Sequence, residues 1–271
     1  MTEKGYFKSG GNKLFYVADL PEDQWAHAGV LFVHAADGNR LGPHRMLVEM
    51  ADRLQSMGIA AMRFDLTGCG DSSGRQSQNE IQQDVADVLA AIEFFKARYS
   101  IKNLYLFGIS RGARVSFSVI AENEAIVAGA ILLSTPAPVR GASAKTVFIR
   151  IKEYIYKFRE PENLKKFLTG KANIKQILKT LLFAMGANKR YRQKQNNDFA
   201  RKRPLLFIYG TKDPMAMGAC GFYRGICGRF EIPHKIIEIE GANHSFFHYR
   251  WKEQIFEEAQ RWLMEKRMPE K

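Results

Sequence analysis

The chain has 271 residues, 46% of them hydrophobic, which is enough to bury the core of one large α/β domain. No apolar run approaches the roughly 20 residues that span a bilayer, and the first residues lack the pattern of a secretion signal. The three cysteines form neither an even disulfide framework nor a metal-ligand spacing with the six histidines. We therefore expect a soluble, cytoplasmic protein with reduced thiols.

Strand and helix signals alternate along most of the chain. Leu14–Ala18 predicts part of an edge hairpin. Short apolar runs between turn signals predict buried strands at Gly29–His34, Ile59–Phe64, Leu104–Phe107, Val127–Leu133, Leu205–Tyr209 and Lys235–Ile239. Helical segments are predicted at Arg45–Met57, Glu80–Tyr99, Arg111–Glu122, Met215–Cys227 and Tyr249–Met264. This order predicts an α/β fold with a mostly parallel sheet covered by helices on both faces.

The alternation stops after Leu133 and resumes at Leu205. Between these points, Val147–Phe158 and Ile174–Met185 carry apolar residues at helical spacing. We therefore predict a core formed by residues 1–135 and 204–271, with a helical lid inserted at 136–203.

The inserted segment also carries the basic excess of the chain. Residues 139–203 contain 18 Lys and Arg against 4 Asp and Glu, a net charge of +14, whereas the whole chain has a net charge of +13. A solvated face is the ordinary explanation of such a cluster, and the alternatives are an anionic membrane surface, an acidic acyl carrier protein or nucleic acid. The last is the least favoured, because no nucleic-acid-binding motif accompanies the charge.

The most informative motif is Gly108-Ile109-Ser110-Arg111-Gly112, between a predicted strand and a predicted helix. A serine serves as a nucleophile on an open α/β sheet when a sharp turn lifts its hydroxyl above the strand ends. Glycines on both sides suit such a crowded turn, because a Cβ atom would clash there. Ser110 is therefore the candidate nucleophile.

A serine hydroxyl needs a base within hydrogen-bond reach and a third group that orients the base. Two later loops offer them: Asp213 follows one predicted strand, and His244 follows the next. The order Ser110, Asp213, His244 is the order of an α/β-hydrolase triad, and each residue follows a predicted strand. His248 is a rival base in the same region.

These motifs resemble the α/β-hydrolase family over essentially the whole chain. Membership would imply that Ser110 attacks a carbonyl, that His244 takes and returns the proton, and that Asp213 holds the imidazole. The segments Asn39–Arg45 and Arg63–Ser72 are similar to a bacterial acyl-hydrolase branch that includes exosortase-associated hydrolases and small carboxylesterases.

The resemblance also implies an oxyanion hole built from two backbone N–H groups. Arg111, the residue after the nucleophile, supplies one, and Ala36 is the candidate for the other. Ala35 stands where many relatives carry glycine. Nearby, Asp37, Arg40 and Arg45 are candidates for contact with substrate, against the alternative that Arg40 and Arg45 only brace the loop.

The sequence therefore predicts a serine hydrolase that cleaves a carboxylic ester or thioester, free or linked to an acyl carrier, without metal or organic cofactor. The alternative is a non-catalytic binding or scaffold protein of the same fold. It is motivated by Ala35, which replaces the glycine of many relatives in the oxyanion loop, and by the basic segment. Neither the acyl chain nor the leaving group follows from the sequence.

Overall fold

The computed structural model describes residues 1–22, 27–36, 38–76, 81–122, 126–137, 203–215 and 218–267. Nearly all of the lid predicted at 136–203, and Asp37 of the oxyanion loop, lie outside the described residues. The strands are β1 (Thr2–Ser9), β2 (Asn12–Asp19), β3 (Ala28–Val33), β4 (Ala60–Phe64), β5 (Asn103–Ile109), β6 (Gly129–Leu133), β7 (Leu205–Gly210) and β8 (His234–Ile239). The helices are η1 (Pro43–Arg45), α1 (Met46–Ser56), α2 (Gln82–Tyr99), α3 (Arg111–Glu122), α8 (Ala219–Arg229) and α9 (Tyr249–Arg267).

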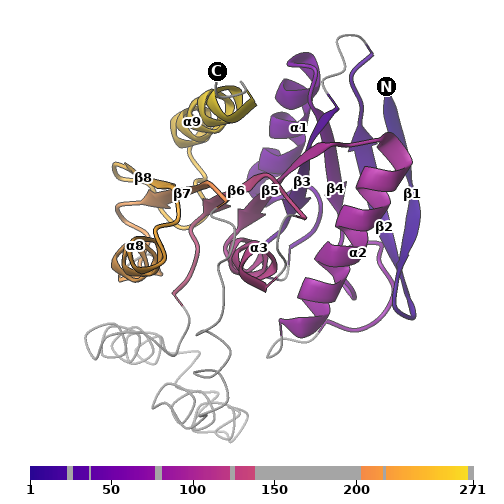
Figure 1. The fold of residues 1–271 in the computed structure, drawn as a ribbon, viewed down its shortest axis with the longest axis horizontal. Helices are drawn as coiled ribbons and strands as arrows, with labels where there is room; N and C mark the ends of the chain where they lie inside the picture. The colour runs from indigo at the N-terminus through magenta and orange to yellow at the C-terminus, as the bar shows by residue number, and fades with distance from the viewer. Residues whose placement is uncertain are drawn as a thin grey trace, which may run out of the picture.

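The eight described strands form one sheet in the order β1-β2-β4-β3-β5-β6-β7-β8. The β1–β2 and β2–β4 pairs are antiparallel, and all later pairs are parallel. Figure 1 shows α1 and α9 on one side of this sheet and α2, α3 and α8 on the other. The predicted α/β-hydrolase fold, a mostly parallel sheet with helices on both faces, is confirmed.

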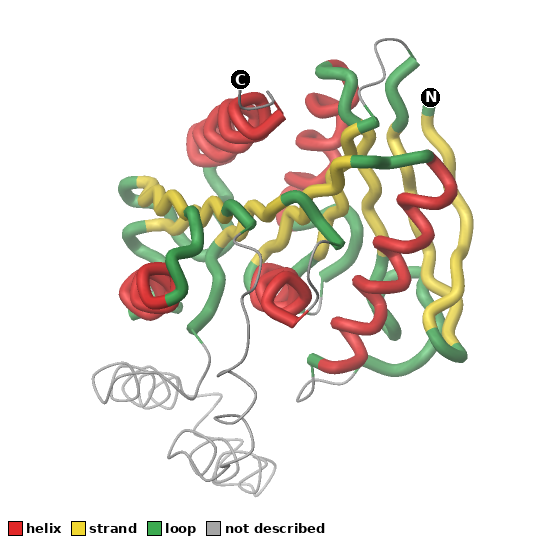
Figure 2. Tube along the Cα trace, in the orientation of Figure 1, coloured by secondary structure: helices red, strands yellow, loops and turns green. Residues whose placement is uncertain are grey.

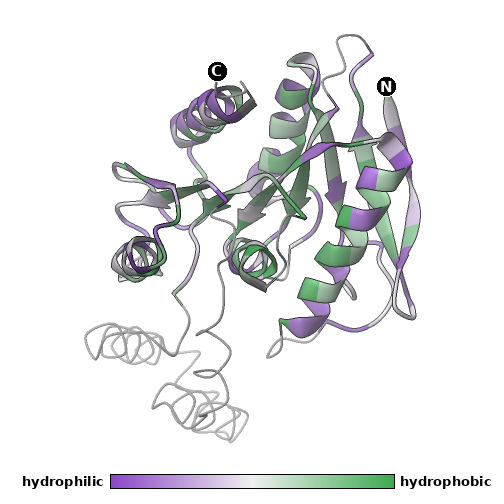
Figure 3. Cartoon of the chain, viewed as in Figure 1, coloured by the Kyte–Doolittle hydropathy of each residue, from purple (hydrophilic) through white to green (hydrophobic). Residues whose placement is uncertain are grey.

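The core consists of two apolar layers separated by the sheet, as the arrangement of strands between helices in Figure 2 indicates. Side chains alternate along each strand. In β3, Leu31 and Val33 therefore join the layer under α2, α3 and α8, whereas Val30 and Phe32 join the layer under α1 and α9. The inner strands are apolar on both faces, as parallel strands buried between helices must be (Figure 3).

The predicted helix Met215–Cys227 is wrong at both ends, because α8 begins at Ala219 and ends at Arg229. A turn precedes it: the backbone N–H of Met215 donates to Asp213 Oδ1 over 2.9 Å, and Gly218 has a left-handed φ of 82°. Both features take the chain out of the helical conformation before Ala219. Asp213 is thus held in a turn rather than at a helix end.

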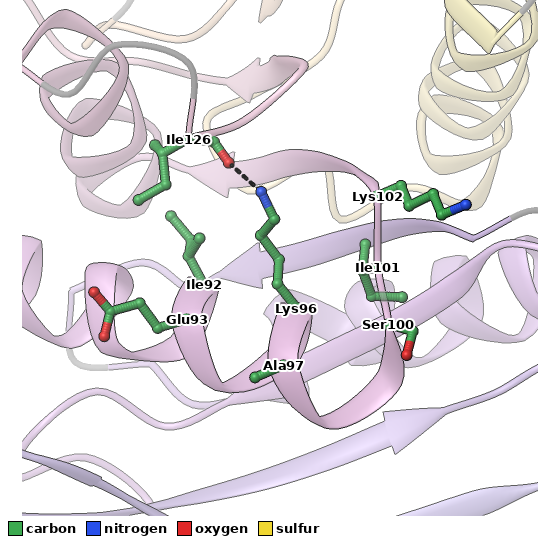
Figure 4. A pocket seen from close by; sticks show the side chains of 8 residues that line it. All are labelled: Ile92, Glu93, Lys96, Ala97, Ser100, Ile101, Lys102 and Ile126. Atoms are coloured by element: carbon green, nitrogen blue, oxygen red, sulfur yellow. Dashed lines mark hydrogen bonds between the residues drawn. The ribbon is translucent and has the colours of Figure 1, made fainter.

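Among the described residues, two of the hollows lie at opposite ends of the parallel strands. The larger, about 610 Å³, lies between the end of α2 and the chain that enters β5 and β6 (Figure 4). The smaller, about 280 Å³, lies at the carboxyl ends of β3 and β5 and contains Ser110 and His244 in its lining. Open α/β sheets place their sites at the carboxyl ends of the strands, so the smaller hollow is the candidate site.

Candidate active site

Ser110 stands in a strained turn between β5 and α3. Its φ is +53°, in the left-handed region that side chains other than glycine rarely adopt. Its backbone N–H donates to the Leu133 carbonyl oxygen of the neighbouring strand over 2.8 Å, which holds the turn in place. The hydroxyl is thereby presented at the end of the sheet.

The glycines on both sides of Ser110 are required by close backbone contacts. A Cβ on Gly108 would come within 2.5 Å of Ala113 Cα in the first turn of α3. A Cβ on Gly112 would come within 2.2 Å of the Val33 carbonyl oxygen and 2.4 Å of the His34 carbonyl oxygen. The motif therefore allows α3 to pack directly on the chain that leaves β3.

His244 lies between the hydroxyl and a carboxylate. Its Nε2 is 2.9 Å from Ser110 Oγ, and its Nδ1 is 2.8 Å from Asp213 Oδ2. The structure thus brings together three side chains separated by up to 134 residues. In this geometry Nδ1–H donates to the carboxylate, which leaves Nε2 as the acceptor for the serine proton.

The carboxylate of Asp213 is buried and held from several sides. Burial by itself would raise its pKa, but the hydrogen bond and charge of His244, with hydrogen bonds from Ser134 and the Met215 N–H, lower the pKa below its usual range. The Asp213 loop is joined to the His244 loop, because the Lys212 N–H donates to the Ala242 carbonyl oxygen over 2.9 Å. The carboxylate therefore stays ionised beside the imidazole.

The rival base His248 lies at the exposed start of α9. Its ring packs against Tyr249 and Trp251, with ring centroids 4.8 and 5.4 Å away. Its Nδ1 accepts a hydrogen bond from the Arg250 N–H at 3.3 Å. Between the two histidines, the hydrogen bond to Ser110 Oγ belongs to His244.

The loop after β3 forms one wall of the pocket, with Ala35 and Ala36 in its lining. His34 holds the base of this loop: its Nδ1 is 2.7 Å from the Ala35 carbonyl oxygen, and its Nε2 accepts from the Leu66 N–H at 3.0 Å. Burial lowers the pKa of His34, which keeps the ring neutral for both contacts. The full lining consists of His34, Ala35, Ala36, Gly38, Asn39, Gly42, Pro43, Ile109, Ser110, His244 and Ser245.

The two candidate arginines of this region have different surroundings. The Arg40 guanidinium forms ion pairs with Asp65 and Asp71 and lies over the Phe15 ring, with Cζ 4.4 Å from the centroid. These contacts brace the loop. Arg45 is exposed just before α1, with a left-handed φ of 59°, two residues after Pro43 in the pocket lining.

Sequence reasoning missed Asp84 on α2. Its Oδ2 is 2.5 Å from Arg111 Nε, and both side chains are almost entirely buried. A signal for it was available: Asp84 lies at helical spacing from Val88, Ala91 and Phe95, all of which face the core. A carboxylate on the apolar face of a helix needs a buried partner.

Among the residues that the structure describes, no three His, Cys, Asp or Glu side chains gather as a metal site. In the same part of the chain, no helix is both long and apolar enough to cross a membrane.

Comparisons with known proteins agree on the family and the fold. A family model described as serine aminopeptidase, S33, matches residues 42–248. The chain is 32% identical to the lysophosphatidylserine lipase of Mus musculus over 111 residues, which are 41% of this chain and 26% of the lipase. A corresponding lipase of Danio rerio is 33% identical over 97 residues, 36% of this chain and 24% of the lipase. The matches thus span about a quarter of those lipases.

A longer match joins the chain to the esterase EstD of Thermotoga maritima, 22% identical over 209 residues, or 72% of this chain and 48% of the esterase. Among solved structures, Est1E of Butyrivibrio proteoclasticus with bound ferulic acid has a TM-score of 0.66 at 18% identity, covering 97% of this chain and 98% of that one. An esterase of Pyrococcus furiosus has a TM-score of 0.66 at 20% identity, covering 97% and 91%. At these identities the structural likeness concerns the fold.

Proposed function

The chain belongs to the serine hydrolase family whose model it matches, serine aminopeptidase S33, and from this premise we propose that it cleaves carboxylic esters or thioesters through an acyl-serine intermediate. One observation carries the proposal: Ser110 Oγ, the His244 ring and the Asp213 carboxylate form a continuous hydrogen-bonded chain beside a pocket. A hydroxyl, a base and an orienting carboxylate in this order activate a serine for acyl transfer.

In the first half of the proposed reaction, His244 Nε2 takes the Ser110 proton while Oγ bonds to the substrate carbonyl carbon. The carbonyl oxygen becomes an oxyanion, which accepts hydrogen bonds from the backbone N–H groups of Ala36 and Arg111. The tetrahedral adduct collapses as His244 returns the proton to the departing alcohol or thiol. Ser110 is left as an acyl ester.

In the second half, His244 takes a proton from water, and the hydroxide so formed attacks the acyl carbon. Collapse releases the carboxylic acid and returns the proton to Ser110 Oγ. Asp213 remains ionised throughout and stabilises the imidazolium of His244 in both halves, a role supported by its lowered pKa.

Ester cleavage is favoured over peptide cleavage, although the family model is described by an aminopeptidase. An aminopeptidase must bind a free ammonium group, and no acidic side chain is present in the lining of the described pocket. The likeness to an esterase over most of the chain supports the same choice. We therefore expect turnover of p-nitrophenyl esters and negligible turnover of aminoacyl p-nitroanilides.

For the substrate we propose an ester or thioester with an apolar acyl chain. Phe247 and Tyr249, which follow the pocket residue Ser245 in the sequence, are 53% and 60% exposed and offer apolar surface to a ligand. The likeness to lysophosphatidylserine lipases makes lysophospholipids a class to test. A series of acyl lengths, assayed with alcohol and thiol leaving groups, separates these possibilities.

The basic segment 139–203 is the proposed contact with an anionic membrane surface or an acidic acyl carrier. Attraction between unlike charges is screened by salt. Turnover of a carrier-linked or vesicle-bound substrate should therefore fall as salt rises, whereas turnover of a soluble uncharged ester should change little. Equal salt dependence of the two would refute a charged contact.

A fluorophosphonate probe tests the central proposal, because it reacts with activated serines. We expect labelling of the wild type and loss of labelling in Ser110→Ala, with p-nitrophenyl ester turnover lost in parallel. A folded wild type that neither reacts with the probe nor turns over esters would favour the non-catalytic scaffold. Labelling that persists in Ser110→Ala would place the nucleophile elsewhere.

A further inference from the structure

The residue after the nucleophile has a buried charged side chain. Arg111 Nε lies 2.5 Å from Asp84 Oδ2, and the side chains are 11% and 3% exposed. The contact joins α3, at the first residue after Ser110, to the first turn of α2. This buried ion pair therefore lies directly beside Ser110 in the chain and joins the two helices.

This pair has an electrostatic cost. Burial raises the pKa of Asp84, while the hydrogen bond and charge of Arg111 act in the opposite direction. Moving two charges out of water costs several kcal/mol, so apolar residues of similar volume often serve stability as well or better. A gain in stability is therefore a poor explanation for the pair, and a gain in positional accuracy is a better one.

The helix that carries Asp84 is itself firmly held. Val88, Ala91 and Phe95, which follow Asp84 at helical spacing, are fully buried in the apolar core. The position of Asp84 is thus fixed by the packing of α2, so a contact with Asp84 can restrain a neighbouring segment.

The strained segment is the turn at Ser110, with its φ of +53°. The backbone N–H of the next residue, Arg111, is the group that the proposed reaction uses to bind the oxyanion. A hydrogen-bond donor of this kind works because it is fixed before the reaction, and a shift of about 1 Å can cost about 100-fold in rate. The side chain of Arg111 is where the fold can restrain that N–H.

We propose that Asp84 is a positioning residue of the active site: through the Arg111 side chain it fixes the backbone N–H that stabilises the oxyanion. Asp84 does not touch substrate and takes no proton. The inference rests on the proposed function, since it assigns a task within that reaction.

Two variants test it, Asp84→Asn and Arg111→Gln, both of which keep the backbone donor. In each, kcat for a p-nitrophenyl ester should fall by about 10- to 100-fold with KM changed by no more than about twofold, as expected when an interaction specific to the transition state is weakened. Affinity for an alkyl boronic acid, which mimics the tetrahedral adduct, should fall by a similar factor. Arg111→Lys should retain more kcat than Arg111→Gln.

The matched control is Asp87→Asn, a buried carboxylate on the same helix that accepts hydrogen bonds from Thr67, Ser9 and Gln83 rather than from the turn at Ser110. It should lower the melting temperature at least as much as Asp84→Asn but leave kcat within about twofold of the wild type. Circular dichroism establishes that each variant is folded. The double variant Asp84→Asn with Arg111→Gln should lose less kcat than the product of the two single losses.

Three results would overturn the inference. They are a wild-type kcat in Asp84→Asn, an equal fall of kcat in Asp84→Asn and Asp87→Asn, and a change in KM alone. An unchanged kcat would exclude a positioning role for Asp84. Equal losses in the two variants would indicate general loosening of α2, and a change in KM alone would indicate a role in substrate binding. Failure of the proposed function is a distinct result, because the wild type itself would then show no turnover.

Discussion

The two hollows described above differ in size and in chemistry, and the difference in chemistry follows from strand direction. The amino-end hollow of about 610 Å³ is lined by the end of α2 and the residues that enter β5 and β6 (Figure 4). The carboxyl-end pocket of about 280 Å³ is less than half as large, yet it contains Ser110 and His244. The site proposed from strand direction is thus the smaller of these two hollows.

The three candidate catalytic residues gather at the carboxyl end of the sheet because of the direction of the strands. Ser110, Asp213 and His244 stand in loops that leave β5, β7 and β8, three strands that run in the same direction. Residues far apart in sequence therefore meet as soon as the strands pair. At the amino ends the chain only enters the strands, and the described lining holds four aliphatic residues, Ser100, Glu93 and two lysines.

The largest test of the carboxyl-end assignment is His244→Ala. Without the base, Ser110 keeps its proton, and kcat should fall by about 10⁶-fold while the fold persists. Ester turnover and thermal melting measure the two effects. The control is His248→Ala, an exposed ring four residues later, which should leave kcat within about twofold. The opposite pattern would transfer the role of base to His248.

A second test concerns the close packing of α3 on β3. Gly112→Ala puts a Cβ 2.2 Å from the Val33 carbonyl oxygen, so the backbone must move. We expect a loss of about 1–3 kcal/mol in the free energy of unfolding, as for overpacking, and a fall in kcat because the Ala36 loop follows β3 directly.

The control for that loss is Gly225→Ala in α8, where no described atom beyond the neighbouring residues and the helix's own backbone lies within 4 Å of the added Cβ. Replacing glycine by alanine within a helix should stabilise the protein by about 0.5–1 kcal/mol, with no change in kcat. Urea unfolding measures both variants. Similar stability changes at the two glycines would show that packing at the Ser110 turn is looser than the structure describes.

The elements that position the site followed from the sequence because their signals are local. Apolar runs identified the six strands β3 to β8, and the G-x-S-x-G pattern identified the turn at Ser110. The start of α8 was predicted four residues early. The spacing of apolar residues gives no sign of the hydrogen bond from the Met215 N–H to Asp213, which holds this segment in a turn. A hydrogen bond between a side chain and a nearby backbone group leaves little trace in an apolar pattern.

Pairings between distant segments could be predicted only where a motif implied them. Ser110, His244 and Asp213 carry such a motif, whereas Asp84 and Arg111 are 27 residues apart with no motif that links them. Burial of Asp84 could be inferred from helical spacing, but its partner could not. The contacts of Arg40 with Asp65 and Asp71 are of the same kind.

A third test uses pH at the carboxyl-end pocket. Burial lowers the pKa of His34 in the folded protein, whereas the same imidazole in the unfolded chain has a pKa of about 6.5. As pH falls below that value, protons bind the unfolded state more readily, so folding stability decreases, by at most about 1.4 kcal/mol per pH unit, until the folded pKa is reached.

His34→Gln removes this contribution. The variant should be less stable than the wild type at pH 7.5, because the contacts to Ala35 and Leu66 are disturbed, but the difference between the two should shrink toward pH 5.5. Urea unfolding at several pH values measures it. A constant difference across that range would mean that His34 titrates alike in both states.

The smallest effect on activity and stability is expected at the amino-end hollow. Lys96 Nζ donates to the Ile126 carbonyl oxygen over 3.3 Å across this hollow (Figure 4). Lys96→Met removes one hydrogen bond at a partly buried site, which should cost no more than about 1 kcal/mol of stability. The ester kcat and KM should remain at wild-type values, since the lysine lies at the opposite end of β5 from Ser110. A fall in kcat without unfolding would show that the two ends of the sheet are coupled, and the larger hollow would then need a role of its own.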